Sequence, residues 1–226
     1  MVRVLTQIEP IQFIQLVQPL LEKNDLNGLL ALLKQHWEPQ DIVDLLRGDH
    51  IDARKVALLA LGLVGERCCV RELAHHLRDP DPIVNQLAEH ALWSVWFRSG
   101  KSCQANRQLA TAATAMNQRD FTTALSACDE AIRIDPDFAE AYNQRAIAHY
   151  LREDFHQSIA DCVRATEKMP CHFGAWAGMG HCYAHLGEHR EALKCYEHAL
   201  EINPHLDCVR QAVGELRRET GFGTEN

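Results

Sequence analysis

The chain has 226 residues, of which 23 are Lys or Arg and 31 are Asp or Glu, giving a formal net charge of −8. A hydrophobic content of 46% indicates a folded protein with apolar surface to bury. No basic run occurs, which argues against nucleic-acid binding, and no stretch approaches the roughly 20 apolar residues that cross a bilayer, so no membrane contact is predicted.

The N-terminal segment MVRVLTQIEPIQFIQLVQPLL alternates Gln with apolar residues and lacks the continuous apolar core of a signal peptide. The nine cysteines show no regular spacing that would indicate a disulfide framework. Both observations predict a cytoplasmic protein with reduced thiols. Helical periodicity alone predicts one or two degenerate helix pairs over residues 9–37.

A longer phrase then occurs twice. The segments 46–64, LRGDHIDARKVALLALGLV, and 77–95, LRDPDPIVNQLAEHALWSV, superimpose with an offset of 31 residues. A short helix over about 70–78 is expected to be the antiparallel partner of the second copy. The pattern resembles HEAT repeats of the short bacterial kind, and this resemblance implies a stack of HEAT-like helical repeats over residues 1–98.

Acidic residues at the start of the second copy have two expected roles. Asp79 or Asp81 is predicted to cap a helix whose first turn accepts Pro82. HEAT families often have an Asp–Arg ladder along one edge, so the resemblance implies that Arg54 approaches Asp81 across the two copies. As an exposed ion pair it would contribute at most about 1 kcal/mol.

The two halves meet at RSGKSC, residues 98–103, which looks at first like a phosphate-binding loop. Such a loop needs a glycine five residues before Gly100, but Val95 stands there inside a predicted helix. Nucleotide binding is therefore not predicted, and residues 99–104 are interpreted as a junction. Because the junction is short, we expect the two arrays to stack as one superhelix; two independently tumbling lobes in solution scattering would contradict this.

The C-terminal half contains three similar phrases, AIRIDPDFAEAY, ATEKMPCHFGAW and ALEINPHLDCVR. Their prolines, Pro136, Pro170 and Pro204, are spaced by 34 residues, and each follows an apolar helical pattern that a proline ends. In the last unit, Gly180 is expected to let two helices approach while Tyr196 fills the remaining volume. The pattern resembles the tetratricopeptide repeat (TPR), whose signature runs W-x2-L-G-x2-Y…A-x3-F…P over about 34 residues.

This resemblance implies three TPR units and a C-terminal capping helix over residues 105–219, followed by a flexible tail, 220–226. The first unit departs from the family pattern, because Gln108 stands where the family prefers an aromatic residue. The predicted fold class is all-α: a right-handed α-α superhelical solenoid of HEAT-like helix pairs, followed by the TPR units and the cap.

Histidines and cysteines cluster late in the chain. His181 and His185 are four residues apart on a predicted helix and could share a metal ion. However, Cys182 takes the place of the glutamate in HExxH, and no CxxC occurs. No metal site, cofactor or catalytic residue is predicted, and the chain is not expected to be an enzyme.

In the TPR family, the second, fifth, ninth, twelfth and thirteenth residues of each unit's first helix point into a concave groove. The residues predicted to bind a partner peptide in this groove are Asn106, Met116, Asn117, Glu140, Asn143, Ile147, Tyr150, His181 and His185. Asparagines are expected to hold an extended peptide's backbone, and Tyr150 and Met116 to supply apolar contacts. Glu140 at the groove rim favours a neutral or basic peptide, and unpaired histidines would titrate near neutrality.

Some TPR domains clamp the C-terminal carboxylate of chaperones with Lys, Asn and Arg, but the matching positions here hold no cation: Leu109, Ala113, Gln144, Gly174 and Gly178. That ligand is therefore excluded. The predicted function is a non-catalytic scaffold or adaptor that binds a protein or peptide partner in the TPR groove. The alternative is a regulatory or assembly subunit of an enzyme, or a HEAT-type lyase-like enzyme. The oligomeric state is not predicted.

Overall fold

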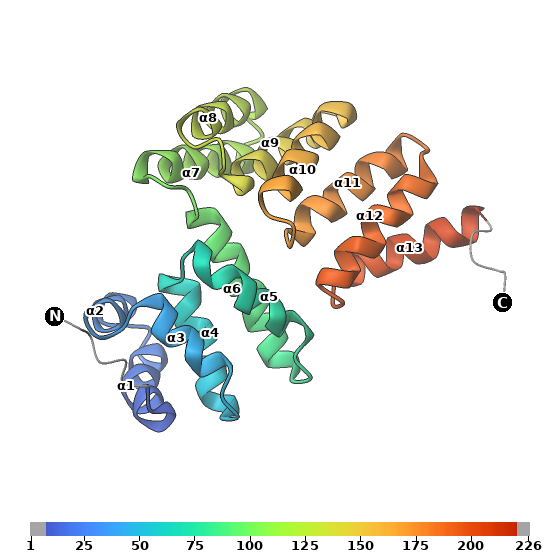
Figure 1. The fold of residues 1–226 in the computed structure, drawn as a ribbon. Helices are drawn as coiled ribbons and strands as arrows, with labels where there is room; N and C mark the ends of the chain where they lie inside the picture. The colour runs from blue at the N-terminus through green and yellow to red at the C-terminus, as the bar shows by residue number, and fades with distance from the viewer. Residues whose placement is uncertain (1–7, 221–226) are drawn as a thin grey trace. The chain divides into compact units, whose positions relative to one another are not determined.

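The computed structural model describes residues 8–220, which form α-helices and two short 3-10 helices and contain no strand (Figure 1). The chain divides into two compact units, Met1–Arg98 (unit 1) and Ser99–Asn226 (unit 2). The all-α class predicted from the sequence is confirmed. The predicted tail lies outside the described residues, except for Thr220 at the end of the last helix.

The helices of unit 1 are α1 (Pro10–Glu22), α2 (Leu26–His36), α3 (Pro39–Leu46), α4 (Ile51–Val64), η1 (Arg67–Cys69), α5 (Val70–His75), η2 (His76–Arg78) and α6 (Pro82–Arg98). Those of unit 2 are α7 (Cys103–Asn117), α8 (Phe121–Ile134), α9 (Ala139–Leu151), α10 (Phe155–Lys168), α11 (Phe173–His185), α12 (His189–Ile202) and α13 (Asp207–Thr220). In unit 2 the helices pack as consecutive pairs, α7 with α8, α9 with α10 and α11 with α12, while α13 packs on α12.

The same turn joins the two helices of every pair in unit 2. Its central residue has a left-handed backbone and recurs every 34 residues: Arg119 (φ 58°), Glu153 (φ 64°) and Gly187 (φ 77°). The next residue's N–H bonds back five residues, as from Asp120 to the carbonyl of Ala115 (2.9 Å). This turn ends the first helix and places the N-terminus of the second beside it.

The turn between α1 and α2 has the same form. Asn24 has a φ of 51°, and the N–H of Asp25 bonds to the carbonyl of Leu20 at 2.9 Å. Asp25 then caps α2 by accepting a hydrogen bond from the N–H of Gly28 at 2.9 Å. The degenerate helix pair predicted near the N-terminus is therefore built on the same kind of turn as the pairs of unit 2.

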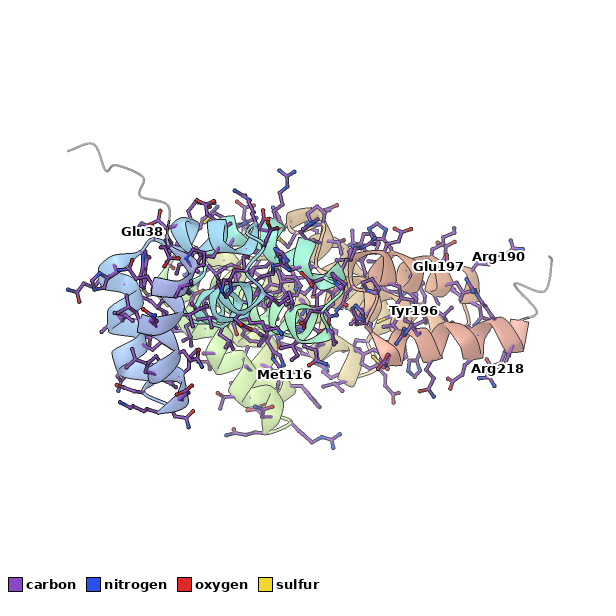
Figure 2. All side chains as sticks on the ribbon, turned by 90° about the horizontal axis from the view of Figure 1, so that it is seen from below. Glu38, Met116, Arg190, Tyr196, Glu197 and Arg218 are labelled. Carbon is purple, nitrogen blue, oxygen red and sulfur yellow. The ribbon has the colours of Figure 1, made fainter. Side chains whose placement is uncertain are left out.

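Close helix packing in unit 2 depends on Gly180. A Cβ placed there would lie 2.5 Å from Tyr196 Cδ1, so α11 and α12 can approach this closely only because the position has no side chain. Tyr196 is 1% exposed, whereas the next residue along α12, Glu197, lies at the surface and pairs with Arg217 at 2.8 Å (Tyr196 and Glu197 are labelled in Figure 2). The predicted roles of Gly180 and Tyr196 are confirmed.

An ion-pair network fastens the start of unit 2 to its first two helix pairs. The backbone N–H of Lys101 donates to the buried Asp135 carboxylate (2.8 Å), and its ammonium group lies 2.7 Å from Asp137. Lys168 contacts the same carboxylate of Asp137 at 2.7 Å. Lys101 and Lys168 together hold the pKa of Asp137 well below its usual range, because both stabilise the ionised form.

In unit 1, α4 and α6 pack through small and apolar residues. A Cβ on Gly62 would lie 3.7 Å from Ala91 Cα, and the side chains of Leu61 and Leu92 are fully buried. Asp81 caps α6, since its Oδ1 accepts hydrogen bonds from the N–H groups of Ile83 (2.8 Å) and Val84 (3.2 Å). The helix predicted near 70–78 is present as α5 followed by η2.

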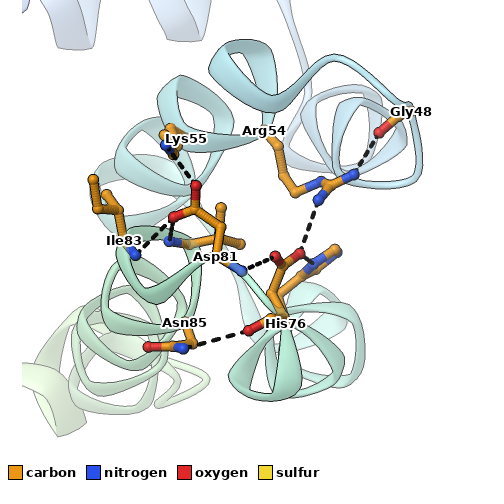
Figure 3. Close-up of polar contacts among 9 residues, drawn as sticks. Gly48, Arg54, Lys55, His76, Asp81, Ile83 and Asn85 are labelled. Atoms are coloured by element: carbon orange, nitrogen blue, oxygen red, sulfur yellow. Dashed lines mark hydrogen bonds and ion pairs between the residues drawn. The ribbon is translucent and has the colours of Figure 1, made fainter.

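The predicted pairing of Arg54 with Asp81 is wrong (Figure 3). Arg54 instead bonds Asp79 Oδ2 at 2.8 Å and the carbonyl of Gly48 at 2.9 Å, while Asp81 pairs with Lys55 at 2.8 Å. Asp81 caps the N-terminus of α6, and Asp79, two residues earlier, therefore pairs with Arg54. The Arg54–Asp79 pair is also more buried than expected, with the two side chains 17% and 6% exposed.

Candidate functional site: a hollow on the TPR-like unit

Three helices of unit 2, α9, α10 and α11, surround a half-open hollow of about 230 Å³. Its lining consists of Asn143, Ala146, Ile147, Tyr150, Ser158, Cys162, Gly174, Ala177, Gly178 and His181. Four of the predicted groove residues are thus brought together: Asn143, Ile147 and Tyr150 from α9, and His181 from α11. The lining contains no Asp, Glu, Lys or Arg, so at neutral pH it carries a formal charge only if His181 is protonated.

The hollow exists because α11 presents almost no side-chain volume to it. Gly174, Ala177 and Gly178 lie on its wall, whereas the equivalent positions of α9, 34 residues earlier, hold glutamate, asparagine and glutamine. A Cβ on Gly178 would meet Cys162 Sγ at 3.5 Å, an ordinary van der Waals contact, so the space could accept a larger side chain. The sequence prediction considered only the first helix of each unit and missed Ser158 and Cys162 of α10. The spacing of Gly174 and Gly178, one helical turn apart, was the signal that could have located the hollow.

The prediction that Glu140 lies at the groove rim is wrong, because its side chain is fully buried. Its carboxylate accepts hydrogen bonds from three side chains: His172 Nε2 (2.7 Å), Gln144 Nε2 (2.7 Å) and Asn143 Nδ2 (3.3 Å). A buried carboxylate needs such donors, since water no longer solvates it. Glu140 therefore lies behind the lining, where it orients the side chains that bond to it, and its charge is not exposed in the hollow.

The protonation of His172 follows from its contacts. Its Nδ1 accepts the N–H of Ala175 at 3.1 Å and so caps α11. The proton must then reside on Nε2, which donates to Glu140, and the neutral ring uses both nitrogens. This arrangement ties the start of α11 to the first turn of α9.

The orientation of the Asn143 amide follows in turn. A carboxylate can only accept, so Asn143 directs Nδ2 toward Glu140. Its Oδ1 has no hydrogen-bond partner within residues 8–220 and remains an acceptor on the lining of the hollow.

Aromatic rings form one side of the hollow. The Tyr150 hydroxyl lies 2.9 Å from His185 Nε2, and the His185 ring stacks on Phe155 with centroids 4.9 Å apart and an interplanar angle of 8°. His185 lies beside the hollow rather than on its lining. The prediction of an unpaired histidine is wrong here, since the imidazole is held between two rings.

His181 is also paired. Its Nδ1 lies 2.7 Å from the hydroxyl of the buried Tyr196. Burial lowers the pKa of His181, so its ring is neutral at pH 7 and the expected titration near neutrality moves to more acidic pH. Burial likewise raises the pKa of the Tyr196 phenol, which therefore keeps its proton.

The remaining predicted groove residues do not join the hollow. Asn106 holds the loop before α7: its Oδ1 accepts the N–H of Gly100 (3.0 Å) and its Nδ2 donates to the carbonyl of Gly100 (3.3 Å). Met116 is partly buried against a cluster of alanines, and Asn117 is exposed. The binding role of all nine residues stays a prediction.

Metal-ligating side chains do not assemble in the part of the chain that the structure describes. Residues 8–220 contain no group of three His, Cys, Asp or Glu side chains that could hold a metal ion. Burial raises the pKa of the Cys128 thiol to about 12. Burial also raises the pKa of the Cys162 thiol on the hollow's lining, so both thiols remain protonated at neutral pH. No helix among these residues is long and apolar enough to cross a bilayer.

Known proteins resemble part of this chain. The tetratricopeptide repeat family model matches residues 174–206. A TPR repeat-containing protein of Rhizobium etli is 33% identical over 139 residues, which cover 62% of this chain and 67% of the relative. Anaphase-promoting complex subunit 3 of Schizosaccharomyces pombe is 30% identical over 99 residues, covering 44% of this chain but 15% of that much longer protein.

Solved structures show the same fold. The first TPR domain of Spaghetti (RPAP3), bound to the HSP90 peptide SRMEEVD, superimposes with a TM-score of 0.52 at 20% identity, covering 54% of this chain and 96% of that one. The TPR2B domain of yeast Sti1, in a complex with an Hsp70 peptide, gives a TM-score of 0.50 at 24% identity, covering 52% and 99%. The structural matches show the fold, and the 33% identity to the Rhizobium etli protein, of which 67% is covered, shows that the chain belongs to the tetratricopeptide repeat family.

Proposed function

We propose that this protein is a non-catalytic scaffold or adaptor that binds a partner peptide over the hollow of unit 2. TPR domains typically mediate protein–protein interactions, and the observation that supports this site is the hollow itself. It is apolar, open on one side, and bordered by residues from adjacent first helices, Asn143, Ile147 and His181 among them.

The proposed partner differs from the chaperone peptides of the structural neighbours. Those domains are solved with HSP90 or Hsp70 peptides, one of which ends in EEVD. A clamp for a terminal carboxylate needs cations, and Gln144, Gly174 and Gly178 occupy its family positions here. We therefore favour an internal peptide segment that is neutral or basic.

The function of unit 1 is a further part of the proposal. Its α4–α6 packing and the Arg54–Asp79 pair between α4 and the loop before α6 support HEAT-like repeats that hold a second partner. The protein would act in the cytoplasm, joining the two partners.

The experiment selects peptides from a displayed random library against the full chain and measures their affinity by fluorescence anisotropy. Ile147→Asp should abolish binding, because a charge would then stand on the lining of an apolar hollow. Val163→Asp is the matched control: Ile147 is 37% exposed and Val163 38%, but Val163 lies outside the hollow. Equal binding by the two variants, or selection of no peptide at all, would overturn the proposed function.

A further inference from the structure

The size and charge of the hollow limit what it can hold. At about 230 Å³ it exceeds the roughly 150 Å³ of an engineered apolar cavity that accepts benzene. One large aliphatic or aromatic side chain therefore fits. A lysine or aspartate side chain would lose its hydration there without meeting a counter-charge, because the lining holds no carboxylate, ammonium or guanidinium group.

The lining includes the hydroxyl of Ser158, but this group already has hydrogen-bond partners within the protein. Ser158 donates its proton to the carbonyl of Ala146 (2.8 Å) and accepts the thiol proton of Cys182 (3.2 Å). The Tyr150 hydroxyl is likewise engaged with His185. These polar groups are satisfied within the protein and do not require a polar ligand.

Two polar atoms of opposite character remain on the lining. Asn143 Oδ1 is an acceptor, as its Nδ2 faces Glu140. The buried Tyr196 hydroxyl has His181 Nδ1 as its partner and must donate to it, since an undonated buried O–H is costly. The proton of the neutral His181 ring then resides on Nε2, which is a donor.

One amino-acid residue of an extended peptide carries a complementary set of groups. Resting on the function proposed above, we propose that the hollow anchors a single bulky, uncharged side chain of the leucine or phenylalanine type. The backbone N–H of that residue donates to Asn143 Oδ1, and its C=O accepts from His181 Nε2–H. The site would thus select one anchor residue and would discriminate against charged and small residues at that position.

Small probes test this without knowledge of the partner. N-acetyl N-methylamides of Leu, Phe, Gly, Asp and Lys are titrated into the labelled full chain, and the NMR shifts of the Ala146, Ile147 and Ala177 methyl groups are followed. Burying a Leu or Phe side chain should make these two probes about 10- to 100-fold tighter than the Gly probe. Replacing the α-N–H of the Leu probe by an ester oxygen should weaken it about 2- to 10-fold.

A variant pair tests the space itself. Gly178→Leu should fill the hollow and abolish the Leu and Phe shifts, whereas Gly214→Leu on α13, where an added Cβ meets nothing within 4 Å, should leave them unchanged. Circular dichroism verifies the helical content of both variants. If Gly178→Leu does not fold, Gly178→Ala replaces it and should weaken the probes at least several-fold.

The outcomes separate this inference from the proposed function. Selected peptides could bind the wild type and fail to bind Ile147→Asp, yet tolerate Asp or Gly at every position and bind Gly178→Leu normally. In that case the proposed anchor is wrong and the proposed peptide binding stands. Equal titration by all five probes would also overturn the anchor. An ester probe as tight as the amide would overturn the hydrogen bond to Asn143.

Discussion

The contact between α11 and α12 gives the sharpest test of the packing argument. Gly180→Ala would place a Cβ 2.5 and 2.6 Å from two ring carbons of Tyr196, far inside van der Waals contact. The ring cannot simply move, because it is buried and its hydroxyl is bonded to His181. Overpacking of this kind costs about 3 kcal/mol at the upper end of its usual range, while replacing a helical glycine by alanine stabilises by about 1 kcal/mol. The expected net loss in unfolding free energy is about 2 kcal/mol.

Urea denaturation followed by circular dichroism measures this loss, and Gly214→Ala is the control. A Cβ at Gly214 meets nothing within 4 Å, so only the gain of about 1 kcal/mol should appear there. The difference of about 3 kcal/mol between the two variants then reports the packing contact alone. A Gly180→Ala protein as stable as Gly214→Ala would refute the idea that this glycine sets the spacing of the two helices.

Three other stability predictions follow from the same structure. Gly187→Ala should lower the free energy of unfolding in urea by about 1 kcal/mol, because the backbone φ of Gly187 is 77° and strain is the only cost, no neighbour lying within 4 Å of an added Cβ. Glu153→Gly, at the equivalent turn, should change the free energy of unfolding by less than about 0.5 kcal/mol. An equal loss in both variants would contradict the role of backbone strain. His172→Ala should cost about 2 to 3 kcal/mol, since it removes one of the three hydrogen-bond donors to the buried Glu140 carboxylate. A neutral result would mean that water solvates this group. Because the pKa of Asp137 is lowered in the folded protein, its ion pairs stabilise the fold fully above the unfolded pKa of about 4 and lose this effect as the pH falls toward the folded pKa. The difference in unfolding free energy between wild type and Asp137→Asn should therefore shrink between pH 7 and pH 2. A constant difference would refute the pairing.

Helix pairs were predictable because their determinants are local and periodic. Proline stops, small residues at fixed spacing and the 34-residue period each act within one or two helices, and they located Gly180 and Tyr196 correctly. The ladder in unit 1 was less predictable. The sequence pattern predicted Asp81 as the partner of Arg54, but Asp81 caps α6 and Asp79 pairs with the arginine instead.

The candidate site was predictable in position but not in electrostatics. The groove positions implied by the TPR resemblance include Asn143, Ile147, Tyr150 and His181, which all line one hollow. The burial of Glu140 could not be foreseen, because it depends on an imidazole 32 residues away whose own orientation is set by capping α11.

Two glycines of α11, two residues apart, have different structural roles. Gly180 faces Tyr196 and sets the spacing of α11 and α12, whereas Gly178 faces the hollow and leaves it open. In the proposed anchor site, substitutions at Gly178 would change which anchor residue fits without disturbing the helix spacing that Gly180 maintains. The proposed ligand preference can therefore drift during evolution, or be redesigned in the laboratory, at little risk to the scaffold.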